Sequence, residues 1–266
     1  MPVIAVDDPD DPRIAVYRNV RDRDLAGRGD GFIAEGEVVI RHLLDAADFE
    51  ARSLLVAAHR LETRHALLAA VPEAVPVYAA PQAVMDGIVG FPIHRGLLAF
   101  GRRRRDHAAT DLLARRPALV LGLVGIANHD NIGGLFRNAA AFGAGAVLID
   151  GTCCDPLYRK ALRVSVGGVL TVPFARTVDA AAMVEALLAA GYTPVGLSPA
   201  GEAQIGAVAE ITRPALLLGA EGPGLPRDLL ARIRSLRIDM APGFDSLNVA
   251  TAGAIALHEL RRALRP

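Results

Sequence analysis

Three short stretches in the C-terminal half of the chain combine polar side chains with glycines where a helix or strand should begin or end. The first, Asn131–Asn138 (NIGGLFRN), carries an amide and a guanidinium six residues apart. The second, Leu216–Leu225 (LLLGAEGPGL), is an apolar strand that runs into a glycine-rich turn with one carboxylate. In the third, Ile238–Leu260, a Pro-Gly-Phe-Asp turn precedes Ser-Leu-Asn and apolar residues at helical spacing. Either Asp245 or Ser246 can cap this predicted helix, whose unpaired N–H groups can bind a polar ligand.

The third stretch continues with small residues. The run 250–254 reads Ala-Thr-Ala-Gly-Ala, which allows a close approach by another backbone, a second subunit or a flat ligand. An ordinary buried helix is the alternative. The stretch alone does not decide between these readings, and the two upstream stretches are needed.

In this order and spacing, the three stretches resemble the motifs of the SpoU (TrmH) family of RNA ribose 2′-O-methyltransferases. Those motifs read roughly N-x-G-A-I-x-R, G-x-E-x-x-G and I-x-M…S-L-N-V, and the resemblance covers residues 119 to 262. Gly134 stands where the family usually has Ala, and Leu135 where it has Ile. Both substitutions keep the helix start small and apolar, so we expect no effect on activity.

The resemblance implies S-adenosylmethionine as cofactor, bent inside a trefoil knot and held largely by main-chain groups of three loops. Carried onto this sequence, those loops centre on Gly219, Ile238 and Leu247. Glycine lets a backbone approach the ligand, and the two apolar side chains offer walls for adenine. The further residues expected near the cofactor are Ser198, Glu221, Met240 and Asn248.

Methylating a ribose hydroxyl is an in-line displacement, so alignment and removal of the hydroxyl proton are the chemical demands. Arg137 matches the family's catalytic arginine, which implies that it anchors RNA phosphate and ribose; a surface salt bridge is the alternative. Because a guanidinium has a pKa above about 12, we favour positioning over a base role. Asn131 is expected to orient Arg137 or its loop. The other three predicted catalytic residues organise the site or the hydroxyl, or are purely structural: Glu221, Ser246 and Asn248.

Other chemistries lack their signatures in this chain. Ser246 has no G-x-S-x-G elbow, which argues against a hydrolase nucleophile. No loop has G-x-G-x-x-G spacing, and Lys160, the only lysine, follows no P-loop. Cys153 and Cys154 are adjacent, without metal-ligand spacing, and indicate two reduced thiols. We therefore expect no metal, dinucleotide or nucleotide triphosphate site.

Composition narrows the class further. Hydrophobic residues make up 52% of the 266 residues, which excludes a disordered chain, and no apolar run is long enough for a membrane span. The N-terminus has acids where an export signal has bases, so we predict a cytoplasmic protein. With 29 basic and 29 acidic residues the net charge is zero, which argues against a general polyanion binder but not against a local basic surface.

Two basic segments could form such a surface. Arg102–Arg105 either contacts RNA phosphates or is a solvated linker. Arg159, Lys160 and Arg163 are plausible RNA contacts, or else a solvated helix face. The segment 155–168 that contains them also resembles the family.

Alternating strands and helices predict an α/β fold with two domains. Residues 1–105, an irregular arm followed by small α/β elements, resemble the L30e-like RNA-binding domain that often precedes the family's catalytic domain. His94-Arg95-Gly96 replaces the family's His-Gln-Gly there, and we give His94 no catalytic role. Residues 116–266 are predicted to form a parallel sheet with helices on both faces, and the resemblance implies the trefoil knot. The predicted strands of this domain are 118–125, 145–149, 168–173, 192–197, 215–219 and 235–240.

We therefore interpret the chain as an S-adenosylmethionine-dependent RNA 2′-O-methyltransferase acting on rRNA or tRNA. Because family members are homodimers, we expect a dimer, with the helix 249–256 as a candidate interface. The alternative is a non-catalytic RNA-binding protein that retains the fold. The sequence does not choose the target nucleotide or identify the proton acceptor.

Overall fold

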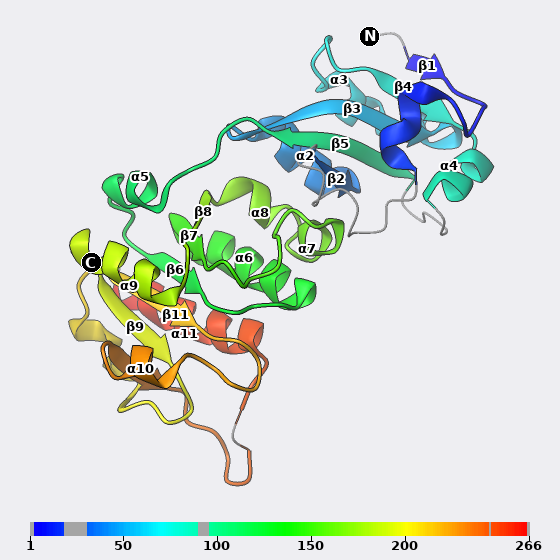
Figure 1. The fold of residues 1–266 in the computed structure, drawn as a ribbon. Helices are drawn as coiled ribbons and strands as arrows, with labels where there is room; N and C mark the ends of the chain where they lie inside the picture. Colours follow the sequence, from blue (N-terminus) through cyan, green and yellow to red (C-terminus); the bar gives the residue numbers. More distant parts are fainter. Residues whose placement is uncertain (1–2, 19–30, 90–95, 245, 265–266) are drawn as a thin grey trace. The chain divides into compact units, whose positions relative to one another are not determined.

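The computed structural model describes residues 3–18, 31–89, 96–244 and 246–264 (Figure 1). The chain divides into two compact units. Unit 1 consists of Met1–Arg105 with Leu157–Thr171, and unit 2 consists of Asp106–Pro156 with Val172–Pro266. The segment 157–171 thus packs with the N-terminal unit, although it lies within the C-terminal half of the sequence.

Unit 1 is a mixed sheet with strand order β1-β4-β3-β5-β2. The central strand β3 is parallel to β4 and antiparallel to β5. The strands are β1 (Val3–Ala5), β2 (Phe32–Glu35), β3 (Phe49–Ala57), β4 (Val77–Ala80) and β5 (Leu97–Arg103). The helices are η1 (Pro12–Tyr17), α2 (Glu37–Asp45), η2 (Ala58–Arg60), η3 (Glu62–Arg64), α3 (His65–Ala69), α4 (Gln82–Val89), α7 (Arg159–Val164) and α8 (Gly168–Thr171).

The N-terminal arm is held to this sheet by a buried tyrosine. Tyr17 is fully buried, its hydroxyl lies 2.8 Å from the hydroxyl of Ser53, and it accepts the N–H of Phe100 at 3.2 Å. Burial raises the pKa of Tyr17, so the phenol stays neutral. Tyr17 therefore joins the described part of the arm, residues 3–18, to the core of unit 1.

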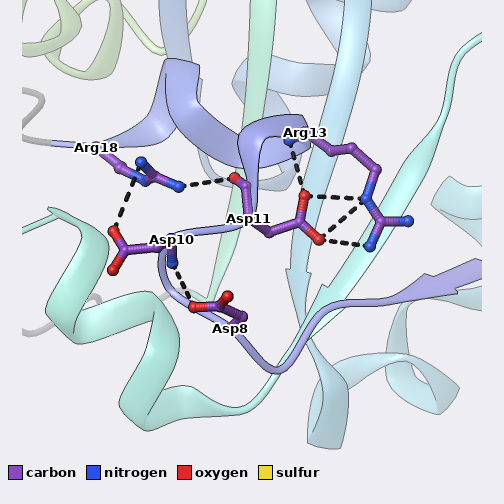
Figure 2. Close-up of polar contacts among 5 residues, drawn as sticks. All are labelled: Asp8, Asp10, Asp11, Arg13 and Arg18. Atoms are coloured by element: carbon purple, nitrogen blue, oxygen red, sulfur yellow. Dashed lines mark hydrogen bonds and ion pairs between the residues drawn. The ribbon is translucent and has the colours of Figure 1, made fainter.

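Figure 2 shows that three acids of the arm, Asp8, Asp10 and Asp11, form hydrogen bonds and ion pairs within the same short segment. Asp11 caps η1 by accepting the N–H of Arg13 at 2.8 Å, and it also binds the guanidinium of Arg13. This hydrogen bond lowers the pKa of Asp11 to about 2. Arg18 donates to the carbonyl oxygen of Asp11 at 2.8 Å and lies 3.6 Å from Asp10, whose N–H binds Asp8. These five charged residues thus bind one another within residues 8–18.

Helices α7 and α8 belong to unit 1 through a buried ion pair and a close backbone contact. Arg159 donates to the carboxylate of Glu35 at 2.7 Å, and both side chains are largely buried. Gly167 has a φ of 85°, and a Cβ atom there would lie 2.5 Å from the ring of His42. The adjacent Val166, with a φ of 53°, is a β-branched residue in the left-handed region, which is a strained conformation.

Unit 2 is a seven-stranded sheet with order β10-β12-β9-β11-β6-β7-β8, and all six of its strand pairs are parallel. Its strands are β6 (Val120–Leu123), β7 (Ala146–Ile149), β8 (Phe174–Arg176), β9 (Thr193–Leu197), β10 (Ala203–Gln204), β11 (Pro214–Leu218) and β12 (Arg234–Arg237). Its helices are α5 (Ala109–Ala114), α6 (His129–Phe142), α9 (Ala180–Ala189), η4 (Ile205–Glu210), α10 (Arg227–Leu230) and α11 (Val249–Ala263). The central strands β6, β7 and β11 are wholly buried, as their unbroken apolar sequences indicated.

Two local predictions were wrong. The range 168–173 is not a strand: Gly168–Thr171 forms α8, and the strand β8 begins at Phe174. A short apolar run cannot be assigned to strand or helix by periodicity, and the turn at Val166 and Gly167 starts a helix here. The cap of α11 is Asn248, whose side-chain oxygen accepts the N–H groups of Ala250 and Thr251. Ser246 is therefore not the cap, and Asp245 lies outside the described residues.

The small residues of α11 allow α6 to approach closely. A Cβ atom on Gly134 of α6 would lie 2.9 Å from the Cβ of Ala250, and one on Gly253 would lie 2.7 Å from the side chain of Leu135. Asn138 of α6 closes the contact by donating to the carbonyl oxygen of Ala250 at 2.8 Å. The sequence allowed another backbone, a second subunit or a flat ligand to approach this face, and in unit 2 the helix α6 packs against it.

Candidate active site

A pocket of about 370 Å³ opens at the carboxyl ends of β9, β11 and β12, next to the first turn of α11. Loops at the carboxyl ends of parallel strands are the usual ligand sites of open α/β sheets. The lining residues come from four short segments: Leu197, Ser198 and Pro199; Leu218, Gly219, Ala220, Glu221, Gly222 and Gly224; Ile238 and Met240; and Ser246, Leu247, Asn248, Val249 and Ala252.

Sequence reasoning placed seven residues around the cofactor, and all seven line this one pocket: Gly219, Ile238, Leu247, Ser198, Glu221, Met240 and Asn248. Of the remaining lining residues, Ser246 was predicted as a catalytic residue, and the others were not predicted individually. Most of them flank the motifs directly and could have been included from that position. Leu197 and Pro199 lie beside Ser198 at the end of β9, where no motif marks them.

The glycine-rich turn after β11 folds tightly back on itself. A Cβ atom on Gly219 would lie 2.1 Å from the carbonyl carbon of Gly224, so only glycine fits there. The turn is closed by the N–H of Gly224, which donates to the carbonyl oxygen of Ala220 at 2.9 Å. Gly222 and Gly224 have φ values of 86° and 70°, in the region that favours glycine. This backbone geometry presents Glu221 at the pocket.

Asn248 joins the three motifs at the polar end of the pocket. Its side-chain oxygen caps α11, and its side-chain NH₂ group donates to Oδ1 of Asn131 at 2.8 Å and to Oε1 of Glu221 at 3.1 Å. Asn131 is 5% exposed and lies in the first turn of α6. A single side chain therefore fixes the start of one helix and orients an amide and a carboxylate from two other segments.

The loop that leads to Asn131 is fixed by a buried carboxylate. Asp150, at the end of β7, accepts the N–H groups of Gly125, Thr152 and Cys153 at 3.0–3.1 Å. Asn128 then caps α6 by accepting the N–H of Asp130. These bonds hold the start of α6 in place and, with it, Asn131.

Two of the five predicted catalytic residues, Asn131 and Arg137, do not line this pocket; Asn131 contacts the lining residue Asn248. Arg137 is exposed on α6, and it makes no hydrogen bond or ion pair with any residue in the described ranges, the lining residues included. Consecutive helical residues point about 100° apart, so Arg137 faces well away from Asn138, which contacts α11. Asn131 is bonded to Asn248, not to Arg137. Ser246, in contrast, does line the pocket.

The two cysteines take no visible part in this site. Burial raises the pKa of Cys153 to about 12 and that of Cys154 to about 11, so both thiols are neutral near pH 7. Across the parts of the chain that the structure describes, no group of three or more His, Cys, Asp or Glu side chains could hold a metal ion. The same residues include no helix long and apolar enough to span a membrane.

The two basic segments are largely engaged in structure. Arg102 and Arg103 lie on β5 and stack over the rings of Phe100 and Phe49. Arg104 binds Glu50 at 3.3 Å. Arg102 and Arg103 are thus part of the sheet of unit 1, and Arg104 follows the end of β5 and binds a residue of β3, so all three belong to unit 1. Arg159 is engaged with Glu35, and His94 and Arg95 lie outside the described residues.

Comparison with known proteins identifies the family of the region that contains this pocket. Residues 118–258, which contain the whole pocket, match the model of the SpoU rRNA methylase family. The chain belongs to the SpoU rRNA methylase family. A protein of Mycobacterium bovis named as an uncharacterised tRNA/rRNA methyltransferase is 39% identical, across 96% of this chain and 91% of its own length. A protein of the same description from Mycobacterium tuberculosis has the same identity and coverage.

Solved structures of this family share the fold. The crystal structure of an AdoMet-bound rRNA methyltransferase from Sinorhizobium meliloti covers 99% of both chains, with a TM-score of 0.83 and 25% identity. A structure described as an RNA 2′-O ribose methyltransferase covers 98% of this chain and 99% of its own, with a TM-score of 0.79 and 26% identity. The α/β fold with its parallel sheet is therefore that of SpoU methyltransferases, and family membership makes this chain an RNA methyltransferase.

Proposed function

We propose that this protein transfers a methyl group from S-adenosylmethionine to a ribose 2′-hydroxyl of rRNA or tRNA. The observation that carries the proposal is the pocket in which all seven predicted cofactor residues meet. At its polar end lies the Asn131–Asn248–Glu221 cluster, where the reacting hydroxyl would be received. The related structures described as AdoMet-bound and as a ribose 2′-O-methyltransferase support the cofactor and the reaction.

The lining residues suit this cofactor. Ile238, Leu247 and Met240 supply apolar surface for an adenine ring, and the turn at Gly219 brings main-chain polar groups to the pocket wall. The cavity volume lies within the range of roughly 300–1,000 Å³ that is usual for small-molecule sites. When bound, S-adenosylmethionine supplies a methyl group on a sulfonium, which is transferred to an aligned oxygen. The chain's own task is to hold that oxygen in line and to take its proton.

We also propose that the C-terminal domain forms a trefoil knot and that the N-terminal domain binds RNA. The loops after β9, β11 and β12 all reach the same pocket, as expected if the C-terminal segment passes through a trefoil knot in residues 116–266. Residues 1–105 would form the L30e-like domain that binds the RNA substrate. A cytoplasmic location follows from such a substrate.

A homodimer would complete the site. Arg137 is exposed and absent from the pocket of its own chain, although it matches the family's catalytic arginine. We infer that a second copy brings its Arg137 to this pocket, where the guanidinium anchors the phosphate next to the attacked ribose. The exposed side of α11 is the candidate interface, since its other side is occupied by α6.

The direct test replaces Arg137. We expect Arg137→Ala to bind S-adenosylmethionine as the wild type does in calorimetry, and to lose at least about a hundredfold in methyl transfer, because one preorganised charged contact is removed. Arg232→Ala is the control, because Arg232 pairs with Glu185 on the surface away from the pocket. Undiminished turnover in Arg137→Ala would remove Arg137 from the mechanism.

Mixed dimers test whether Arg137 acts on the other subunit. In a heterodimer of one Arg137→Ala chain and one Asn248→Ala chain, action across the dimer leaves one intact site, so about half of the wild-type rate should return. If Arg137 served the pocket of its own chain, both sites would be defective and no activity would return.

A non-catalytic RNA-binding protein is the second candidate, and the absence of Arg137 from the pocket is the observation that favours it. Calorimetry separates the two. No binding of S-adenosylmethionine or of its demethylated product would support the second candidate. Mapping ribose methylation in total RNA from a strain that lacks the gene would identify the target nucleotide.

A further inference from the structure

The pocket holds one side chain able to accept a proton near neutral pH. Among the lining residues that the structure describes, Glu221 is the only one with an ionisable carboxylate, and no lysine, arginine or histidine is present. The other polar side chains are Ser198, Ser246 and Asn248, none of which is a base under these conditions. Arg137, which is always protonated, cannot serve either.

The carboxylate of Glu221 is held by one oxygen. Asn248 donates to Oε1 at 3.1 Å, and no other hydrogen bond or ion pair reaches Glu221 from the described residues. Oε2 is therefore available to a ligand in the pocket. Because the same NH₂ group of Asn248 also binds Asn131, the carboxylate, the two amides and the start of α11 form one connected unit.

From this geometry, and resting on the proposed function, we propose that Glu221 is the general base that removes the proton of the ribose 2′-hydroxyl. The hydroxyl oxygen forms a bond to the methyl carbon while the bond from that carbon to sulfur breaks, and the electron pair of the broken bond stays on sulfur. The hydroxyl proton passes to Oε2 of Glu221, so the products are the methyl ether, the neutral thioether and a carboxylic acid that later releases its proton to solvent. No additional reactant is needed.

Proton transfer to carboxylate becomes favourable only as the oxygen–carbon bond forms, because an alcohol is a far weaker acid than a carboxylic acid. The base must therefore be positioned before the reaction starts. The hydrogen bond from Asn248 positions the carboxylate of Glu221, and the hydrogen bond between Gly224 and Ala220 closes the tight turn that positions its backbone. Asn131 and Asn248 are thus positioning residues for Glu221.

The experiment compares Glu221→Gln, which keeps the shape and loses the charge, with Glu221→Asp, which keeps the charge on a shorter side chain. Asp239→Asn is the matched control: it removes a carboxylate between two lining residues that itself binds Gln204 and Arg237 outside the pocket. Single-turnover methyl transfer to total RNA from a strain that lacks the gene is measured at saturating S-adenosylmethionine from pH 6 to pH 9. Affinity for S-adenosylhomocysteine is measured by calorimetry.

We expect Glu221→Gln to bind S-adenosylhomocysteine within about threefold of wild type and to lose roughly 10²–10⁴-fold in rate at pH 7. Its residual rate should rise about tenfold per pH unit, because the proton must then leave with hydroxide, whereas the wild-type rate stays flat. Glu221→Asp should have an intermediate rate and a flat profile. Asp239→Asn should match the wild type.

Two results would overturn the assignment. In the first, Glu221→Gln has a normal rate at saturating cofactor. In the second, its rate falls but shows the flat pH profile of the wild type, which indicates a structural role. Asp245 lies next to the pocket residue Ser246, so Asp245→Asn is measured too; a rising pH profile in that variant alone would make Asp245 the base. Nucleoside analysis of the wild-type product distinguishes failure of the proposed function from failure of the assignment of Glu221. If the product carries no 2′-O-methyl group, the proposed function is wrong. If it does carry one, the results for the variants bear only on the role of Glu221.

Discussion

Two Glu-Gly pairs in this chain have nearly the same φ angle at the glycine and differ in what surrounds the carboxylate. Glu35-Gly36 ends β2 in unit 1, and Glu221-Gly222 lies in the turn after β11 in unit 2. The two glycines have φ values of 88° and 86°. In each case a glycine in a conformation that other residues avoid lets the chain turn sharply directly after the glutamate.

The partners of the two carboxylates differ. The side chain of Glu35 is 8% exposed and bound by Arg159 at 2.7 Å, with Arg163 at 3.9 Å. Glu221 is exposed and is bound by the neutral amide of Asn248 alone among the described residues. The ion pair with arginine ties Glu35 to the fold of unit 1, whereas Glu221 lines a ligand pocket, and its Oε2 has no partner among the described residues. The same dipeptide therefore lies in a buried ion pair at one place and at a ligand pocket at the other, and we propose a chemical role only for the second.

The largest effect expected from this comparison is on stability. Glu35→Ala breaks the largely buried ion pair with Arg159, which costs about 3–5 kcal/mol in the free energy of unfolding. Glu221→Ala removes one exposed hydrogen bond and should cost less than about 1 kcal/mol. Urea denaturation of both variants measures the difference.

A double variant shows whether the cost of Glu35→Ala comes from the broken ion pair. Glu35→Leu with Arg159→Met replaces the ion pair by apolar side chains and should recover most of the lost stability. Equal losses in Glu35→Ala and Glu221→Ala would show that the two carboxylates do not differ in structural role.

The sequence alone predicted the site better than the details of the fold. Six of the seven predicted cofactor residues belong to the motifs after β11 and before α11, and Ser198 follows β9; the carboxyl ends of these parallel strands converge on the pocket. The central strands were also predictable, since β6 and β11 are continuous apolar runs. The exposed edge strands β1 and β10 have three and two residues, too few to show any periodicity.

What the sequence did not predict depends on contacts between distant residues. Nothing local shows that Asn248, rather than Ser246, caps α11, because the choice is fixed by its simultaneous bonds to Asn131 and Glu221. The same holds for α7 and α8: their packing with unit 1 depends on the pair between Arg159 and Glu35, which are 124 residues apart in the sequence. The spacing of residues within a motif does not show which distant residues they contact.

The second prediction tests the close contact between Gly219 and Gly224 in the turn that contains Glu221. In Gly219→Ala the new Cβ atom would meet the backbone of Gly224, which cannot move without opening the turn. Such overpacking costs typically 1–3 kcal/mol, and it should also weaken cofactor binding because the pocket wall shifts. Gly206→Ala is the control, because a Cβ atom there has no neighbour within 4 Å. Thermal unfolding with and without S-adenosylmethionine measures both effects; a normal cofactor-induced shift in Gly219→Ala would contradict the tight-turn assignment.

The third prediction separates the two roles of Asn248. Asn248→Ala removes the cap of α11 and should cost up to about 2 kcal/mol, together with the activity. Asn248→Asp keeps an oxygen that caps the helix, so stability should be close to wild type. It loses the NH₂ group that holds Glu221 and places a second carboxylate beside it, and the methyl-transfer rate should fall as far as in Asn248→Ala. An active Asn248→Asp enzyme would show that the bond to Glu221 is dispensable.

The smallest effect is expected at the glycine that follows Glu221. Gly222 has a φ of 86°, but a Cβ atom there would have no neighbour within 4 Å, so Gly222→Ala carries only the backbone strain, roughly 1 kcal/mol. The turn keeps its closing bond between Gly224 and Ala220, and Glu221 should stay within reach of Asn248. We therefore expect a small loss in the free energy of unfolding and a methyl-transfer rate within about threefold of wild type. A large loss of rate with little loss of stability would show that the backbone at Gly222 contacts substrate or cofactor directly, and that this Glu-Gly pair contributes both of its residues to the chemistry.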